Sequence, residues 1–139
     1  MKTLPDNFDI HCFIDAVISQ DVIKLREFFE PDAQILWANT NEQFTVEEYI
    51  RANCEYPGTW HGQVEEFGEM MPFDSKVYYI VRVWDNDGNT SRTIRRIDLG
   101  NTQNALIQHL TEYWSDVGEP PEWRKEMKIG KQYVDKREN

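Results

Sequence analysis

The first quarter of the chain places apolar residues at helical spacing. One such face, at positions i, i+3, i+4 and i+7, consists of Ile10, Phe13, Ile14 and Val17. This spacing predicts an amphipathic helix capped at Asn7 or Asp9. The spacing returns over residues 22–29, and Pro31 is expected to end this second helix because proline cannot continue the helical hydrogen bonds. Two helices are therefore expected before the first strand.

From residue 33 onward the pattern is mostly that of strands. Residues 33–40 alternate in the manner of a strand, and Thr45 with Glu48 forms a capping box that predicts a third helix. Four further strand segments follow, at residues 59–73, 76–84, 90–99 and 105–114. Within the third of these segments, counting from residue 33, residues 77–84 are apolar on both faces except at Arg82, which places this strand inside the sheet. This order predicts an α+β fold with helices on one face of a curved antiparallel sheet.

The size and charge of the chain limit the kinds of function. Its 139 residues suit one domain, predicted over residues 1–124 and followed by a basic tail at 125–139. The net charge is −10, but the chain from Arg124 onward carries +3, which leaves −13 on the rest. An acidic body repels phosphate backbones, so nucleic acid is not an expected partner. No apolar stretch approaches the roughly 20 residues that cross a bilayer, so we expect no membrane contact and a cytoplasmic location.

The residues that often bind metals or act as nucleophiles form no recognisable motif. His11, His61 and His109 share no ligand spacing, so no metal and no cofactor is expected. Cys12 and Cys54 lie in predicted helices without a CxxC or activating motif, and we interpret both as small buried thiols.

The last predicted strand carries the strongest candidate for chemistry. Alternation places Leu110, Glu112 and Trp114 on one face of this strand. A carboxylate among aromatic side chains could serve as a general acid or base, which makes Glu112 the candidate catalytic residue. Alternation on the segment 90–99 brings Arg95 to the same face, so a buried ion pair between Arg95 and Glu112 is the competing interpretation.

Large aromatic side chains are concentrated on the predicted strands. Four of the five tryptophans lie there: Trp37, Trp60, Trp84 and Trp114. An open curved sheet with three helices cannot bury this much aromatic area without leaving either a pocket or an interface. The double proline at 120–121 should end the last strand, and Trp123 is expected to fold back as a lid or plug.

Four stretches of the chain carry a family resemblance. They read FIDAVISQDVIKLREFFEPDAQILW at 13–37, TVEEYIR at 45–51, RRIDLG at 95–100 and LIQHLTEYWSD at 106–116. Together they resemble the nuclear transport factor 2-like superfamily, specifically its SnoaL-like (polyketide-cyclase-like) branch, over roughly residues 8–124. The resemblance implies a cone, also known as the cystatin-like α+β barrel, in which a strongly curved antiparallel sheet wraps the N-terminal helix around a pocket. It further implies a homodimer that pairs through the outer face of the sheet.

The resemblance also bears on catalysis. The ketosteroid isomerases have a tyrosine that stabilises the oxyanion, an aspartate that acts as general base and a second aspartate. In this chain the resemblance places Phe13 at the position of the tyrosine, Trp37 at that of the general base and Thr93 near that of the second aspartate. None of these side chains can perform those roles, so ketosteroid isomerisation is not expected. In the pattern of the cyclases, Glu112 best matches the acid/base aspartate of the last strand, while the histidine partner on the preceding strand has no match.

Three functional hypotheses follow. The first is binding of a small apolar molecule in a pocket whose predicted lining is Phe13, Trp37, Thr93, Arg95, Leu110 and Trp114. The second is an enzyme of the cyclase or isomerase type, in which Glu112 is the acid/base. The third is an interaction module that binds a partner protein or a second copy of the chain.

Overall fold

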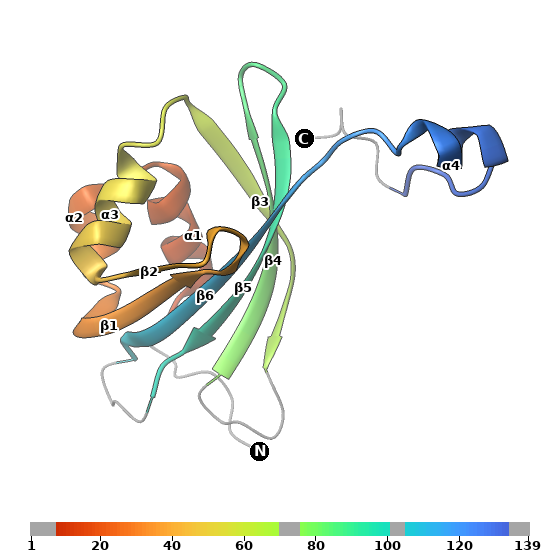
Figure 1. Cartoon of the computed structure of the whole chain (residues 1–139). Coiled ribbons are helices and arrows are strands. Elements are labelled where there is room, and N and C mark those ends of the chain that lie inside the picture. Colours follow the sequence, from red (N-terminus) through yellow and green to blue (C-terminus); the bar gives the residue numbers. More distant parts are fainter. Residues whose placement is uncertain (1–7, 70–75, 101–104, 134–139) are drawn as a thin grey trace.

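The protein, seen in a computed structural model, is described over residues 8–69, 76–100 and 105–133. Its helices are α1 (Ile10–Ile18), α2 (Val22–Arg26), the 3-10 helix η1 (Ala38–Thr40), α3 (Val46–Cys54) and α4 (Glu122–Met127). Its strands are β1 (Phe29–Trp37), β2 (Glu42–Phe44), β3 (Trp60–Glu69), β4 (Lys76–Asp85), β5 (Thr90–Asp98) and β6 (Ile107–Asp116). The helices α1, α2 and α3 lie on one side of the sheet, whereas α4 projects away from it (Figure 1).

The predicted α+β cone is confirmed, with one change in strand direction. The described strands form a six-stranded sheet in the order β2-β1-β6-β5-β4-β3. All neighbouring strands run antiparallel except β1 and β6, which run parallel. The sheet is therefore mixed, because the last strand of the meander returns beside the first strand of the chain.

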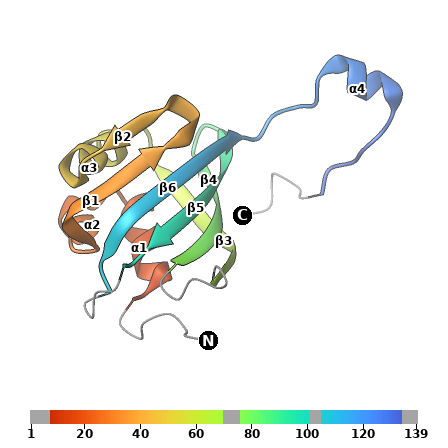
Figure 2. The same ribbon diagram turned by 60° about the horizontal axis from the view of Figure 1, so that its bottom comes forward.

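The first helix supplies one side of the core. Asp9 caps α1 by accepting a hydrogen bond of 3.1 Å from the Cys12 backbone N–H, as the sequence predicted. The fully buried Phe13 ring meets Phe28 and Tyr79 edge-on, at centroid distances of 5.3 and 6.4 Å. In Figure 2 α1 lies behind the strands, against the inner face of the sheet. Aromatic contacts of this kind fix the helix against the sheet.

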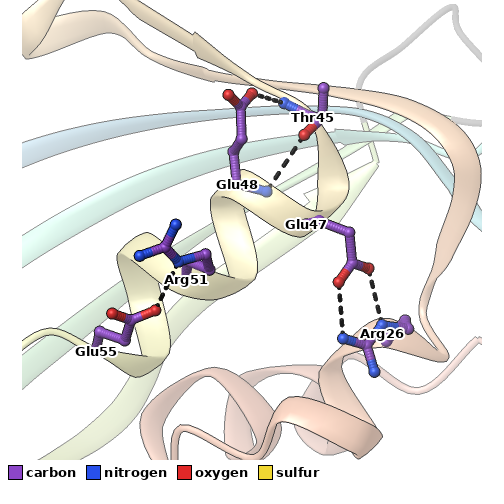
Figure 3. A network of polar contacts seen from close by, with 6 residues as sticks. All are labelled: Arg26, Thr45, Glu47, Glu48, Arg51 and Glu55. Atoms are coloured by element: carbon purple, nitrogen blue, oxygen red, sulfur yellow. Dashed lines mark hydrogen bonds and ion pairs between the residues drawn. The ribbon is translucent and has the colours of Figure 1, made fainter.

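The third helix is held at both ends by polar contacts. The predicted capping box is present, because the Thr45 hydroxyl accepts from the Glu48 N–H and the Glu48 carboxylate accepts from the Thr45 N–H. Glu47 accepts two hydrogen bonds of 2.8 Å from Arg26 at the end of α2, and Arg51 pairs with Glu55 one turn along (Figure 3). Of these contacts, the pair between Arg26 and Glu47 joins α3 to α2, whereas the others stabilise α3 itself.

The second helix is shorter than predicted. It ends at Arg26, and Phe29, predicted as its last apolar residue, begins β1 instead. Phe29 satisfies the helical spacing, but it is buried as a strand residue with 5% of its surface exposed. Pro31 lies inside β1, where the pairing with β6 skips from Phe29 to Gln34, so its missing N–H removes no ladder bond.

Several boundaries and exposures also differ from the prediction. The strand predicted over 33–40 ends at Trp37 and turns into η1, and the short strand β2 was not predicted. Cys54 is half-buried, but Cys12 is exposed, so the interpretation of both as buried thiols was wrong. Trp123 does not fold back as a lid, because it lies on α4 with 61% of its surface exposed.

Some predictions lie partly outside the described residues. These are the end of the strand predicted over 59–73, the loop at 101–104 and the last part of the tail, 134–139. Within the described part of the chain, no helix is long and apolar enough to cross a membrane.

The inner face of the sheet is set by strand alternation. The predicted interior strand is β4, which pairs with both β3 and β5 and buries Val77, Tyr79, Val81 and Val83 on one face. The register of β3 shifts between Val64 and Glu66, and a bulge of this kind bends a strand and increases its twist. The resulting curvature leaves room between the sheet and the helix ends.

Candidate functional site

An ion pair lies at the centre of the inner face. Arg95 on β5 and Glu112 on β6 are direct cross-strand partners, and the Arg95 Nη1 atom contacts the Glu112 Oε2 atom. Neither residue has exposed surface. The Glu112 carboxylate also accepts hydrogen bonds from the Trp37 indole N–H at 2.7 Å and from the Tyr49 hydroxyl at 3.2 Å. The competing interpretation of Glu112, a buried ion pair with Arg95, is therefore what the structure contains.

The Arg95 guanidinium lies among aromatic rings. Its central carbon is 5.6 Å from the centroid of the Trp114 ring and 6.0 Å from that of the Tyr79 ring, and its Nε–H donates to the Thr93 hydroxyl at 3.2 Å. Burial has the largest single effect and lowers the pKa of Arg95, but the charge of Glu112, together with Tyr79 and Tyr49, more than offsets it, so the pKa is raised and the side chain stays cationic. Burial raises the pKa of Tyr79 as well, which keeps this hydroxyl neutral.

A cavity of about 210 Å³ opens beside this ion pair. Its helix-borne and loop-borne walls are Val17, Ile18, Gln20, Asn39, Thr40, Ala52, Asn53 and Tyr56. Its strand-borne walls are Trp37, Trp60, Val83, Ser91, Arg95, Trp114 and Asp116. The cavity therefore lies where α1 and α3 end over the inner face of the sheet.

Half of the predicted lining residues reach this cavity. Trp37, Arg95 and Trp114 form part of its wall. The other three predicted residues, Phe13, Thr93 and Leu110, have no exposed surface and are not part of the wall. Glu112 is not part of the wall either; it lies behind Arg95 and Trp37, with which it makes its contacts.

The residues that the sequence analysis missed lie further along the same strands and on the helix ends. Alternation from Thr93 leads to Ser91, and alternation from Trp114 leads to Asp116. The Ser91 hydroxyl donates to the Asp116 carboxylate at 2.7 Å. Extending the alternation by one step would have found this pair, whereas the helical walls depend on packing that no local pattern reveals.

Side-chain amides hold part of the cavity wall in place. Gln20, which has a left-handed backbone with φ of 57°, donates to the carbonyl oxygens of Asn53 and Tyr56 at 2.9 and 2.7 Å. Asn39 exchanges two hydrogen bonds with the Trp114 backbone, at 2.6 and 2.7 Å. A left-handed backbone is uncommon outside glycine, and at Gln20 these bonds compensate for it. The amides tie the end of α1 to the end of α3, and η1 to β6.

The residues of the wall limit what the cavity can hold. Across residues 8–69, 76–100 and 105–133, no three His, Cys, Asp or Glu side chains gather in a way that could hold a metal ion. The wall is mainly apolar, with the Arg95 guanidinium as its one cationic group and Asp116 as its one anionic group among the described residues. Such a site can enclose an apolar molecule and offer it a few polar contacts.

The ion pair predicts an asymmetric response to mutation. Replacing Arg95 by Met leaves the Glu112 carboxylate buried without a cation, so the free energy of unfolding should fall by about 3–5 kcal/mol. The double variant R95M/E112L, which removes both charges, should recover much of this loss. Urea denaturation measures the free energy of unfolding of the single and the double variant. Arg92→Met on the same strand, which removes a partly exposed pair with Glu65, is the control and should cost no more than about 1 kcal/mol. Equal losses for Arg92→Met and Arg95→Met would contradict the structural role of the pair.

Comparison with known proteins identifies the fold. No protein-family model and no curated protein matches the chain. Among solved structures, a protein from Kribbella flavida DSM 17836 with the provisional name ketosteroid isomerase is similar at a TM-score of 0.70 and 19% identity, with 90% of this chain and 87% of that chain covered.

Two further solved structures agree with this match. An NTF-2 like protein of unknown function from Burkholderia xenovorans LB400 has a TM-score of 0.68 at 17% identity, with 91% and 92% covered. A protein from Shewanella putrefaciens CN-32, provisionally described as a SnoaL-like polyketide cyclase, has a TM-score of 0.58 at 12% identity, with 74% and 75% covered. At sequence identities this low, structural similarity shows that the fold is shared but does not show that the activity is shared. The chain has the nuclear transport factor 2-like fold, which SnoaL-like proteins share.

Proposed function

We propose that this protein binds a small apolar molecule in the cavity between α1, α3 and the sheet. The observation that supports the proposal best is the cavity itself, which has a volume of about 210 Å³ and a mainly apolar wall. An engineered apolar cavity of about 150 Å³ in another protein binds benzene, so the space in this protein suits one ring with a short substituent. Pockets for drug-sized ligands begin at roughly 300 Å³, which argues against a larger molecule.

Binding is better supported than acid–base catalysis by Glu112. A general acid or base has to come within hydrogen-bond reach of the reacting proton. Glu112 has no exposed surface, its carboxylate already has Arg95, Trp37 and Tyr49 as partners, and it is not part of the cavity wall. Catalysis would require this network to open, whereas binding requires no rearrangement of it.

Filling the cavity should abolish binding. Ala52 on α3 is part of the wall, so Ala52→Phe places a ring inside the space without removing an existing side chain. One-ring hydrocarbons such as ethylbenzene should change the tryptophan fluorescence of the wild-type protein, because Trp37, Trp60 and Trp114 line the cavity. The Kd of Ala52→Phe should rise by roughly tenfold or more.

The control for this experiment is Arg51→Phe. Arg51 is the adjacent residue of α3 but is exposed, so the same ring is added to the same helix on the solvent side. This variant should bind like the wild type. If no one-ring hydrocarbon alters the fluorescence of the wild-type protein, or if Ala52→Phe binds as well as Arg51→Phe, the proposal fails.

A second proposed property is self-association through the outer face of the sheet. Tyr113 on β6 pairs with Ile94 on β5, and Ile94 pairs with Ile80 on β4, so the three side chains form a row across adjacent strands. Ile94 and Tyr113 are 49% and 43% exposed. An apolar row on a regular sheet face fits against the same row of a second copy in an isologous contact.

Sedimentation of the full chain at micromolar concentration tests this property. The wild-type protein should sediment as a dimer, and Ile94→Glu should shift it to a monomer because a charge would be buried in the contact. Ile23→Glu is the matched control, since Ile23 lies on α2 with 72% of its surface exposed. A monomeric wild-type protein, or a dimer that Ile94→Glu leaves intact, would refute self-association through this face.

A further inference from the structure

Two buried hydrogen-bond donors in the cavity wall have no acceptor. The Arg95 Nη2 atom and the Trp114 Nε1 atom are both buried, and neither has a hydrogen-bond partner among the described residues. The two side chains are neighbours, since the guanidinium carbon lies 5.6 Å from the centroid of the Trp114 ring. The buried Tyr79 hydroxyl interacts with the guanidinium as a weak hydrogen-bond partner, so Trp114 Nε1 is the donor with the clearest lack of an acceptor among the described residues.

Donors of this kind are uncommon in folded proteins. More than about nine in ten buried polar groups have a partner, because an unpartnered one loses its hydration without compensation. Of the other nitrogen atoms of the Arg95 guanidinium, Nη1 contacts Glu112 in the ion pair and Nε donates a hydrogen bond to Thr93. Arg95 and Trp114 both belong to the cavity wall, so the acceptor that they lack can come from a molecule inside the cavity.

The charges around the cavity favour a neutral acceptor over an anion. The positive charge of Arg95 is already compensated by Glu112 directly behind it. Asp116 adds a negative charge to the wall, and the described residues of the wall offer no second cation. A carboxylate in the cavity would therefore lack a free counter-charge, whereas an uncharged oxygen needs only the two N–H donors.

We infer that the ligand is a neutral molecule of about one ring that carries an oxygen acceptor, such as a carbonyl group, directed at Arg95 Nη2 and Trp114 Nε1. This inference rests on the proposed binding function and adds the chemical class of the ligand. In this inference the apolar part of the molecule packs against Val17, Ile18 and Val83, and the oxygen lies beside Arg95 and Trp114, which belong to the same cavity wall. The two donors then select between molecules of the same shape.

A matched set of probes tests the inference. Acetophenone carries a carbonyl oxygen, α-methylstyrene has nearly the same shape without it, and benzoate carries a charge. In the ¹⁵N-labelled full-length protein, acetophenone should bind roughly tenfold more tightly than α-methylstyrene, which is the difference expected for a satisfied buried donor. It should also shift the Trp114 indole N–H resonance, assigned by its loss in Trp114→Phe. Benzoate should bind more weakly than acetophenone.

Variants separate a specific contact from general packing. Trp114→Phe removes one donor while keeping an aromatic ring, so the preference for acetophenone over α-methylstyrene should shrink. Trp123→Phe changes an exposed indole on α4 and should leave the preference unchanged. Neither variant replaces Arg95 or Glu112, and Trp114→Phe keeps an aromatic ring beside the guanidinium.

The outcomes distinguish this inference from the proposed function. If acetophenone and α-methylstyrene bind equally and the Trp114 resonance does not move, the acceptor is a buried water and the inference is overturned, while the binding function stands. If benzoate binds best, the preference for a neutral molecule is wrong. If none of the three probes binds, the proposed function itself fails and the inference fails with it.

Discussion

The buried pair of Arg95 and Glu112 is the interaction on which the inner face of this protein depends. Two charges without exposed surface are stable only if each is compensated by an opposite charge or by hydrogen bonds. In this fold the compensating groups come from three strands and one helix. They are Arg95 and Thr93 on β5, Glu112 on β6, Trp37 on β1 and Tyr49 on α3. Because each partner must stay in place, the pair fixes the register of β5 on β6 and the position of α3 over the sheet.

The cavity is a consequence of how the helices end over this inner face. Gly62 on β3 allows α1 to approach closely, since a Cβ atom there would lie 2.9 Å from the Ile18 side chain. Gln20 then ties the end of α1 to the end of α3. The walls of the space that remains include three tryptophans and Arg95. The same side chain that balances Glu112 is thus also part of the wall of this space.

The sequence predicted the α+β architecture and offered the ion pair as one of two interpretations of Glu112, because both follow from local patterns. Strand alternation alone placed Arg95 and Glu112 on one face, and the structure makes them direct cross-strand partners. The sequence could not predict the position of the cavity, since helical periodicity does not reveal where Ile18 or Ala52 lies over the sheet. Local spacing also misassigned Phe29, which fits a helical pattern but is buried from β1. Tertiary packing decided these positions.

The most direct test is a crystal structure of the ligand-free protein under xenon pressure. Xenon enters apolar cavities that exclude water. We expect a xenon atom against Val17, Ile18 and Val83, with Arg95 still paired to Glu112 behind it. The opposite result is a space filled by side chains or by a chain of ordered waters, with the Glu112 carboxylate turned toward that space and away from Arg95. That result would contradict both the structural role of the ion pair and the binding role of the cavity.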